Sequence, residues 1–135
     1  MYFLSEQLKV KEALASATKE IAADDTAIDY ESDAIDIMDC FHKDMALLVK
    51  SKVNKITSST TFTTVVSISH CDTEAGEFEE VNHIVFKNEP AVLDTQLFNL
   101  IGVKADELKR YIKVKVSVNG KDGDTSIIEA DILYM

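Results

Sequence analysis

The chain has 135 residues, 46% of them hydrophobic, and its 24 acidic and 14 basic residues give a net charge of −10. This length suits one domain with a sizeable core, or a small domain with a helical arm. The acidic balance argues against a phosphate-reading surface, and no apolar run reaches the roughly 20 residues of a membrane-spanning helix.

Two helices are predicted in the first part of the chain. The first spans about residues 5–22, where small and apolar residues recur at helical spacing after the N-cap Ser5. The second spans about residues 30–55, where apolar residues step by three or four with one interruption at Lys52. Its acidic start and basic end match the helix dipole. Its apolar face is wider than one small sheet needs to cover, which implies a second packing partner.

The middle of the chain is predicted to contain two strands and a third helix. Residues 61–69 alternate apolar side chains and threonines as a strand does. After an acidic loop, residues 78–86 form a second strand with a less regular pattern. The third helix begins near Pro90 and is closed by Gly102, because proline suits a first helical turn and glycine a helix end.

The clearest pattern lies in residues 111–118 and 128–134, where apolar and polar residues alternate. Alternation with a period of two predicts two half-buried strands. We predict that they pair as a hairpin with Ile112 opposite Ile132 and with Gly123 in the left-handed position of a three-residue loop. This register forms two opposite-charge pairs on the solvent side, Lys113 with Asp131 and Lys115 with Glu129.

These elements predict an α+β fold in which two N-terminal helices precede a ββαββ body with a mainly antiparallel four-stranded sheet. Residues 1–56 would form the helical arm and residues 57–135 the sheet body, unless the two pack as one compact domain. Met1 to Glu6 lack the basic flank and apolar core of a signal peptide. We therefore expect the protein in the cytoplasm, or within a virus particle assembled there.

Residues 24–39 form the most acidic stretch of the chain. Within it, Asp29, Glu31 and Asp33 have the alternate spacing that opens an EF-hand loop. However, Ala34 stands where that loop needs glycine, and Cys40 where it needs a bidentate glutamate. We interpret the stretch as a solvated helix start. Loose binding of a divalent cation and docking of a lysine-rich partner stay open as alternatives.

One set of residues resembles zinc ligands or a Cys–His pair: His70, Cys71, Asp72 and His83. In a hairpin of the two middle strands, His70 lies at the loop and His83 well down the second strand. They are then too far apart to share an ion. No nucleotide-binding or hydrolase motif is present. We therefore expect no metal, no cofactor, no catalytic residue and no enzymatic activity.

Lys113 and Lys115, with Tyr111 beside them, form a basic strand face of the kind that single-strand-binding sheets use. The predicted pairs with acidic residues would neutralise this face, so nucleic acid is not the expected partner. An OB-like single-stranded nucleic-acid-binding protein, using these three residues, remains the first alternative. A small acidic chaperone or inhibitor is the second.

The function that we predict is a non-catalytic structural or interaction subunit of a larger protein assembly, such as a virion shell or connector component. Such a subunit would form oligomers with itself or with other subunits, and it would not bind membranes. The predicted interface combines the apolar first residues with the apolar face of the second helix. Its residues are Tyr2, Phe3, Leu4, Leu8, Ile35, Met38, Phe41, Met45 and Leu48.

Overall fold

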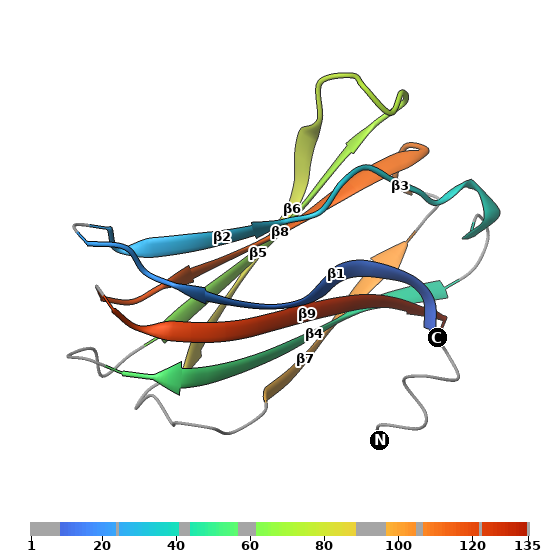
Figure 1. Cartoon of the computed structure of the whole chain (residues 1–135). Helices are drawn as coiled ribbons and strands as arrows, with labels where there is room; N and C mark the ends of the chain where they lie inside the picture. The colour runs from blue at the N-terminus through green and yellow to red at the C-terminus, as the bar shows by residue number, and fades with distance from the viewer. Residues whose placement is uncertain are drawn as a thin grey trace.

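A computed structural model describes residues 9–23, 25–40, 44–56, 62–88, 97–104, 107–121 and 123–134. Over these residues the chain is built of β-strands and one short 3₁₀ helix, η1 (Met38–Cys40) (Figure 1). The strands are β1 (Lys9–Glu20), β2 (Ala27–Glu31), β3 (Ile35–Asp36), β4 (Asp44–Lys55), β5 (Phe62–Cys71), β6 (Glu79–Asn88), β7 (Leu97–Lys104), β8 (Tyr111–Asn119) and β9 (Thr125–Tyr134). None of the described residues belongs to a helix that is long and apolar enough to cross a membrane.

The strands form two antiparallel sheets stacked as layers (Figure 1). Sheet A has the order β1-β9-β4-β7. Sheet B has the order β2-β8-β5-β6, and β3 pairs with β8 beyond the end of β2. Because β2 and β3 share one strand position, each sheet has four positions, and the chain crosses repeatedly between the two sheets. This connectivity is that of a jelly roll, in which two Greek keys enclose one core.

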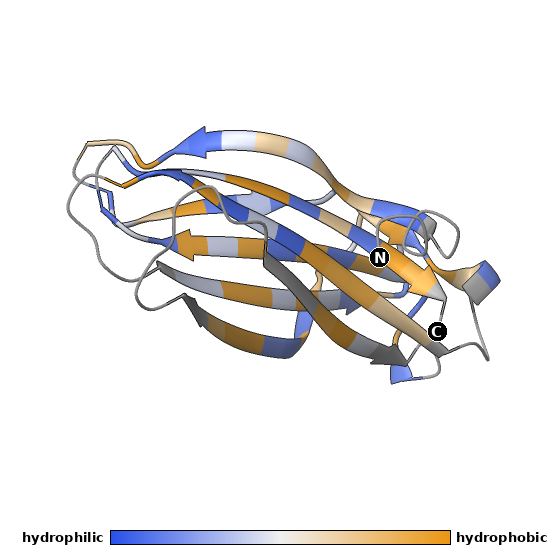
Figure 2. Ribbon diagram, turned by 90° about the horizontal axis from the view of Figure 1, so that it is seen from below, coloured by the Kyte–Doolittle hydropathy of each residue, from blue (hydrophilic) through white to orange (hydrophobic). Residues whose placement is uncertain are grey.

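The core between the sheets is filled by alternate side chains of the central strands, as period-two strands require. Figure 2 shows the resulting alternation of hydrophobic and hydrophilic residues along the strands. The sequence pattern therefore predicted the core-facing residues of the last two strands correctly, but Asp131, expected on the solvent side, is buried. The core residues that β8 and β9 contribute are Ile112, Val114, Val116, Val118, Ile128, Ala130 and Ile132.

Tyr30 of β2 links the two sheets through its hydroxyl group. The hydroxyl donates to the carbonyl oxygen of Ser126 on β9 at 2.8 Å, and it lies 2.9 Å from the Ser126 hydroxyl. Burial raises the pKa of Tyr30 above its ordinary value, so the phenol stays neutral. A buried polar group is thus satisfied at the place where the sheets meet.

The predicted α+β fold is wrong, because strands stand where all three helices were expected. Residues 9–20 form β1, residues 44–55 form β4, and the end of the third predicted helix lies in β7. The error at β4 has a clear cause. Its residues from Met45 to Ser51 are all buried, since β4 is a central strand. A continuous apolar run in such a strand cannot be told from a buried helix by periodicity.

The predicted hairpin of the last two strands is also wrong, because β8 belongs to sheet B and β9 to sheet A. Ile112 lies opposite His70 of β5, not opposite Ile132. The alternating pattern identifies the buried face of a strand, and two strands that face each other across a core satisfy it as well as two paired strands do. Gly123 does adopt the left-handed conformation, with φ of 85°.

The predicted boundary near residue 56 falls between β4 and β5, and strands from both sides of it interleave in both sheets. In sheet A, β9 lies between β1 and β4. In sheet B, β2 and β3 pair with β8. The first strands are therefore integral to the sandwich and do not form a separate helical arm.

Candidate functional site

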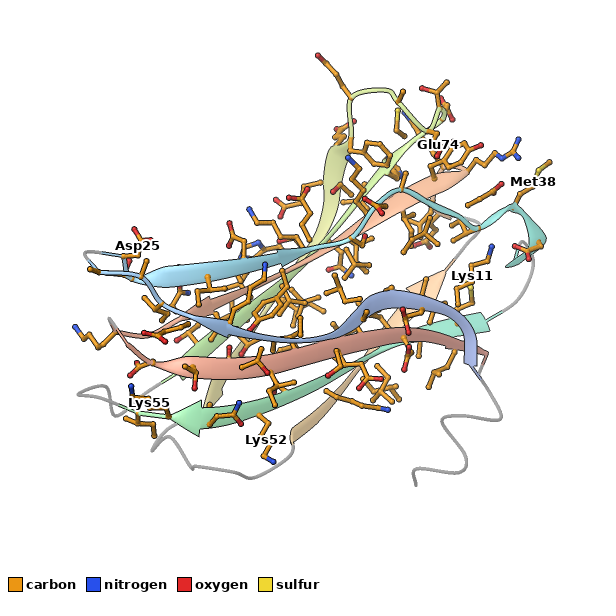
Figure 3. The ribbon with its side chains drawn as sticks, in the orientation of Figure 1. Lys11, Asp25, Met38, Lys52, Lys55 and Glu74 are labelled. Carbon is orange, nitrogen blue, oxygen red and sulfur yellow. The ribbon has the colours of Figure 1, made fainter. Side chains whose placement is uncertain are left out.

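The structure places the residues of the predicted partner interface in different environments. Tyr2, Phe3, Leu4, Leu8 and Phe41 lie outside the described residues. Among the others, Met45 and Leu48 on β4 are buried within the single chain, and Ile35 on β3 is half-buried against the core. Only Met38 is an exposed large apolar side chain, at 56% of its full surface. It points outward from η1 at one end of the sandwich (Figure 3).

Acidic residues near Met38 pair with bases of the same chain. Two nitrogens of Arg110, Nε and Nη2, donate hydrogen bonds to the Asp36 carboxylate. The shortest contact, between Nη2 and Oδ2, is 2.9 Å. This bond holds the pKa of Asp36 below its ordinary value. Lys11 lies 3.1 Å from the carboxylate of Asp39. These acids of the 24–39 stretch thus connect the end of the sandwich to β1 and to Arg110, the residue before β8.

The proposed nucleic-acid residues share the outer face of β8, but their charges and rings are engaged within the chain. Lys115 lies 3.5 Å from the Asp29 carboxylate. Lys113 stands over the Phe78 ring, with its ammonium 4.6 Å from the centroid, and Arg110 covers the ring of Tyr111. The two lysines therefore have partners, although not the acids predicted from the sequence.

The metal-like set is spread along the β5–β6 pair. His83 lies opposite Ser67, three residues along β5 from His70, which corresponds to roughly 10 Å. The His70 ring accepts a hydrogen bond from the backbone N–H of Lys109 at 3.1 Å. Within the described parts of the chain, no group of three or more His, Cys, Asp or Glu residues is arranged to hold a metal ion.

A different surface, which the sequence did not reveal, lies on strand β6 at the margin of sheet B. Among the described strands, β6 has one neighbour, β5. Val81 and Val85 expose 43% and 49% of their surface, and the His83 side chain exposes 55%. We call these three residues the β6 surface. An exposed edge strand with apolar side chains is a template for pairing with another chain.

A β-bulge shapes this surface. Ile68 lies opposite Asn82 while Ser69 lies opposite Glu80, so Val81 is an extra residue in β6. The extra residue brings Glu80 to the same face as His83, which strict alternation would prevent. It also explains why the pattern of this strand is irregular in the sequence.

The bulge creates a small polar network beside Val85. The Glu80 carboxylate is hydrogen-bonded to the Ser67 side chain, and its Oε1 lies 3.3 Å from His83 Nδ1. The bond to Ser67, followed by the bond to His83, lowers the pKa of Glu80 below its ordinary value. The folded state thus favours the charged carboxylate, so this stabilisation is present above the unfolded pKa and is lost as the pH falls through the folded pKa.

Replacing Ser67 with alanine should raise the pKa of Glu80 towards its ordinary value, because the strongest interaction with the carboxylate is lost. The matched control is Ser69→Ala on the same strand, which should leave the pKa unchanged. The carboxyl carbon shift of Glu80, followed by NMR against pH, measures both. An unchanged titration midpoint in Ser67→Ala would show that the network does not form.

One edge of β6 has no neighbour among the described strands, and this free edge also presents backbone groups. The His83 N–H donates to the side-chain Oδ1 of its neighbour Asn82 at 2.9 Å, so it is not bonded to β5. In an antiparallel ladder, alternate residues direct both their N–H and C=O groups to the same neighbour. The backbone groups of His83 and Val85 therefore point to the free edge, whereas those of Ile84 and Phe86 point to β5.

The opposite margin of the sandwich differs, because β1 and β2 are tied to each other there. Lys19 of β1 donates to the carbonyl oxygen of Asp29 on β2 at 2.9 Å, and its ammonium lies 4.9 Å from the centroid of the Tyr30 ring. Within the described residues, the margin with β6 is thus the better candidate for contact with another molecule.

No protein-family model matches the sequence, and no curated protein matches it. The structure is similar to solved ones at low sequence identity. It is similar to the enzymatically active domain of bacteriophage CBA120 tailspike protein 4, with a TM-score of 0.57 and 14% identity over 90% of this chain and 18% of the tailspike chain. It is also similar to TmCBM61, solved in complex with β-1,4-galactotriose, with a TM-score of 0.53 and 12% identity over 89% of this chain and 70% of the other.

A weaker similarity is to the VP2 subviral particle of infectious bursal disease virus, with a TM-score of 0.48 and 8% identity over 94% of this chain and 32% of the other. Identities this low show the fold alone. The fold is that of a β-sandwich, which serves in structural and in binding domains.

Proposed function

We propose that the chain is a non-catalytic subunit of a larger protein assembly, and that it associates with other subunits through the β6 surface. The observation that supports this most is the edge of β6 that no described strand covers, where exposed Val81 and Val85 flank backbone groups that point away from the sheet. Natural edge strands are usually blunted by lysine, proline or a cover. β6 has one lysine, Lys87, near its end, and the segment from Asn82 to Phe86 contains neither lysine nor proline.

A concentration series of the purified chain tests this function by sedimentation velocity. A single strand pair belongs to the small, transient interfaces that bury less than about 1,200 Å², so the series should extend into the millimolar range. We expect species larger than the monomer that disappear on dilution, and that the double variant Val81→Ser with Val85→Ser weakens. The control is Leu100→Ser, which removes another exposed side chain, from β7 of sheet A. A monomer at every concentration would contradict the proposal.

A second candidate is a glycan-binding domain. The observation that favours it is the cluster of Ser67, Glu80 and His83 beside exposed Val85, which offers polar groups next to an apolar surface. TmCBM61, which has a similar fold, was solved with β-1,4-galactotriose. Titration with that trisaccharide tests the idea. Heat of binding that is lost in Glu80→Gln would favour the glycan-binding function over the assembly function.

A further inference from the structure

We infer that β6 pairs with β6 of a second copy of this chain, antiparallel and about a two-fold axis that passes between the two Val85 residues. This inference rests on the proposed function and identifies the partner of the same surface. It follows from the sequence and backbone geometry of the β6 edge. Two copies of this edge can pair in one register that places apolar residues opposite apolar residues.

The bulge sets the first limit on that register. A regular ladder cannot run through the extra residue Val81, so the usable part of the strand is Asn82–Asn88. The direction of the backbone groups sets the second limit. Residues at odd-numbered positions, such as His83 and Val85, direct their N–H and C=O groups to the edge. In an antiparallel pair they must therefore lie opposite odd-numbered residues of the partner.

Residue types then select one register. With Val85 opposite the partner's Val85, Ile84 lies opposite the partner's Phe86, and apolar residues meet apolar residues throughout. Polar residues meet polar residues in the same way. Asn82 is placed opposite the partner's Asn88, and His83 opposite the partner's Lys87. A shift of two positions in either direction places Val85 opposite a polar residue, at position 83 or 87.

The inner side of the pairing continues the core of each sandwich. Ile84 and Phe86 are partly buried and pack against the core of their own chain. In this register they form close, non-hydrogen-bonded pairs across the two-fold axis, and a pairing between an aromatic and a β-branched side chain stabilises a sheet. On the outer side the two Val85 residues meet, which covers the apolar surface that a single copy exposes.

The pairing has one local cost. The His83 N–H is already bonded to Asn82 in the single chain, and that bond must be exchanged for one to the partner strand. The N–H of Val85 needs no such exchange, because it points away from β5 to the edge that no described strand covers. In the dimer the two Val85 residues form a hydrogen-bonded pair about the axis and exchange two bonds. Such an interface is isologous and closes at two copies, as a two-fold axis requires.

Cross-linking through cysteine tests the register. With both native cysteines, Cys40 and Cys71, replaced by serine, Val85→Cys should form a disulfide-linked dimer on mild oxidation. A directly opposite hydrogen-bonded pair has its Cα atoms about 5.5 Å apart, within the range that a disulfide spans. Val81→Cys in the same background is the control. Its two copies would lie eight residues apart along the ladder, roughly 26 Å, and should not link.

The outcome separates this inference from the function on which it rests. Efficient linkage of Val85→Cys with little linkage of Val81→Cys supports the register. If the chain self-associates but Val81→Cys links as well as Val85→Cys, the register is wrong and the assembly function stands. If the chain sediments as a monomer at every concentration and neither variant links, both are wrong.

Discussion

Replacing Val85 with lysine should weaken self-association by roughly ten- to a hundredfold. In the inferred register the two substituted residues lie directly opposite each other, so the change introduces a like-charge pair and removes an apolar one. The fold should tolerate the change, because Val85 is about half exposed on an edge strand and surface substitutions usually shift stability by less than about 0.5 kcal/mol. Sedimentation velocity over a concentration series measures the effect.

The matched control for this result is Val81→Lys. It changes the same residue type on the same strand at a similar exposure, 43% against 49%. Val81 belongs to the β6 surface but lies in the bulge, outside the paired segment, so association should fall less than in Val85→Lys. An equal loss in the two variants would indicate packing between sheet faces in place of pairing between edges. Thermal unfolding of both variants checks that neither change acts through stability.

Replacing Leu47 with alanine should lower the free energy of unfolding by about 2–5 kcal/mol. Leu47 is 1% exposed in the core, on a strand of sheet A that pairs with both β7 and β9. The loss should appear as one cooperative transition of the whole chain, because strands from both halves interleave. Urea unfolding followed by both fluorescence and circular dichroism measures it.

Leu100→Ala is the control for this change, since Leu100 is 57% exposed on β7 and should lose less than about 1 kcal/mol. A helical arm would behave differently from the sandwich. In that arrangement Leu47→Ala would melt the first part of the chain and leave the second part folded. Two separate transitions would therefore contradict the interleaved jelly roll.

The strands of sheet B show what a sequence of this kind can reveal. β5, β6 and β8 were predicted as strands, because a half-buried strand repeats every two residues. Their partners were not predictable in the same way. Lys115 has Asp29 as its ionic partner, and nothing in the alternation of residues 111–118 distinguishes that acid from Glu129. The period of the pattern and the charges identify which face of a strand is buried. Which strand pairs with it depends on how the chain crosses between the two sheets.

The first half of the chain shows the limit more sharply. β1 is rich in alanine and other residues that suit a helix, yet it pairs with β9 along most of its length. Here pairing with a buried strand outweighs local propensity. The acidic stretch that resembled a helix start contains β2, β3 and η1 instead. Its dipole-like charge pattern reflects ionic contacts such as Asp36 with Arg110.

The candidate site was missed for a related reason. Ile84, Val85 and Phe86 form an apolar run, and a run of three in a strand must place at least one side chain outward. That signal was present in the sequence. What it could not show is that β6 lies at a margin of its sheet, nor that a bulge at Val81 brings Glu80 beside His83.

Hydrogen exchange of the Val85 amide tests the central claim most directly. In the single chain this N–H points to the free edge of β6, so it should exchange fast when the protein is dilute. In the paired form it donates to the partner strand, and its exchange should slow as the protein concentration rises, while the Ile84 amide, directed to β5, stays protected throughout. Exchange of the Val85 amide that is equally fast at every concentration would contradict pairing through β6.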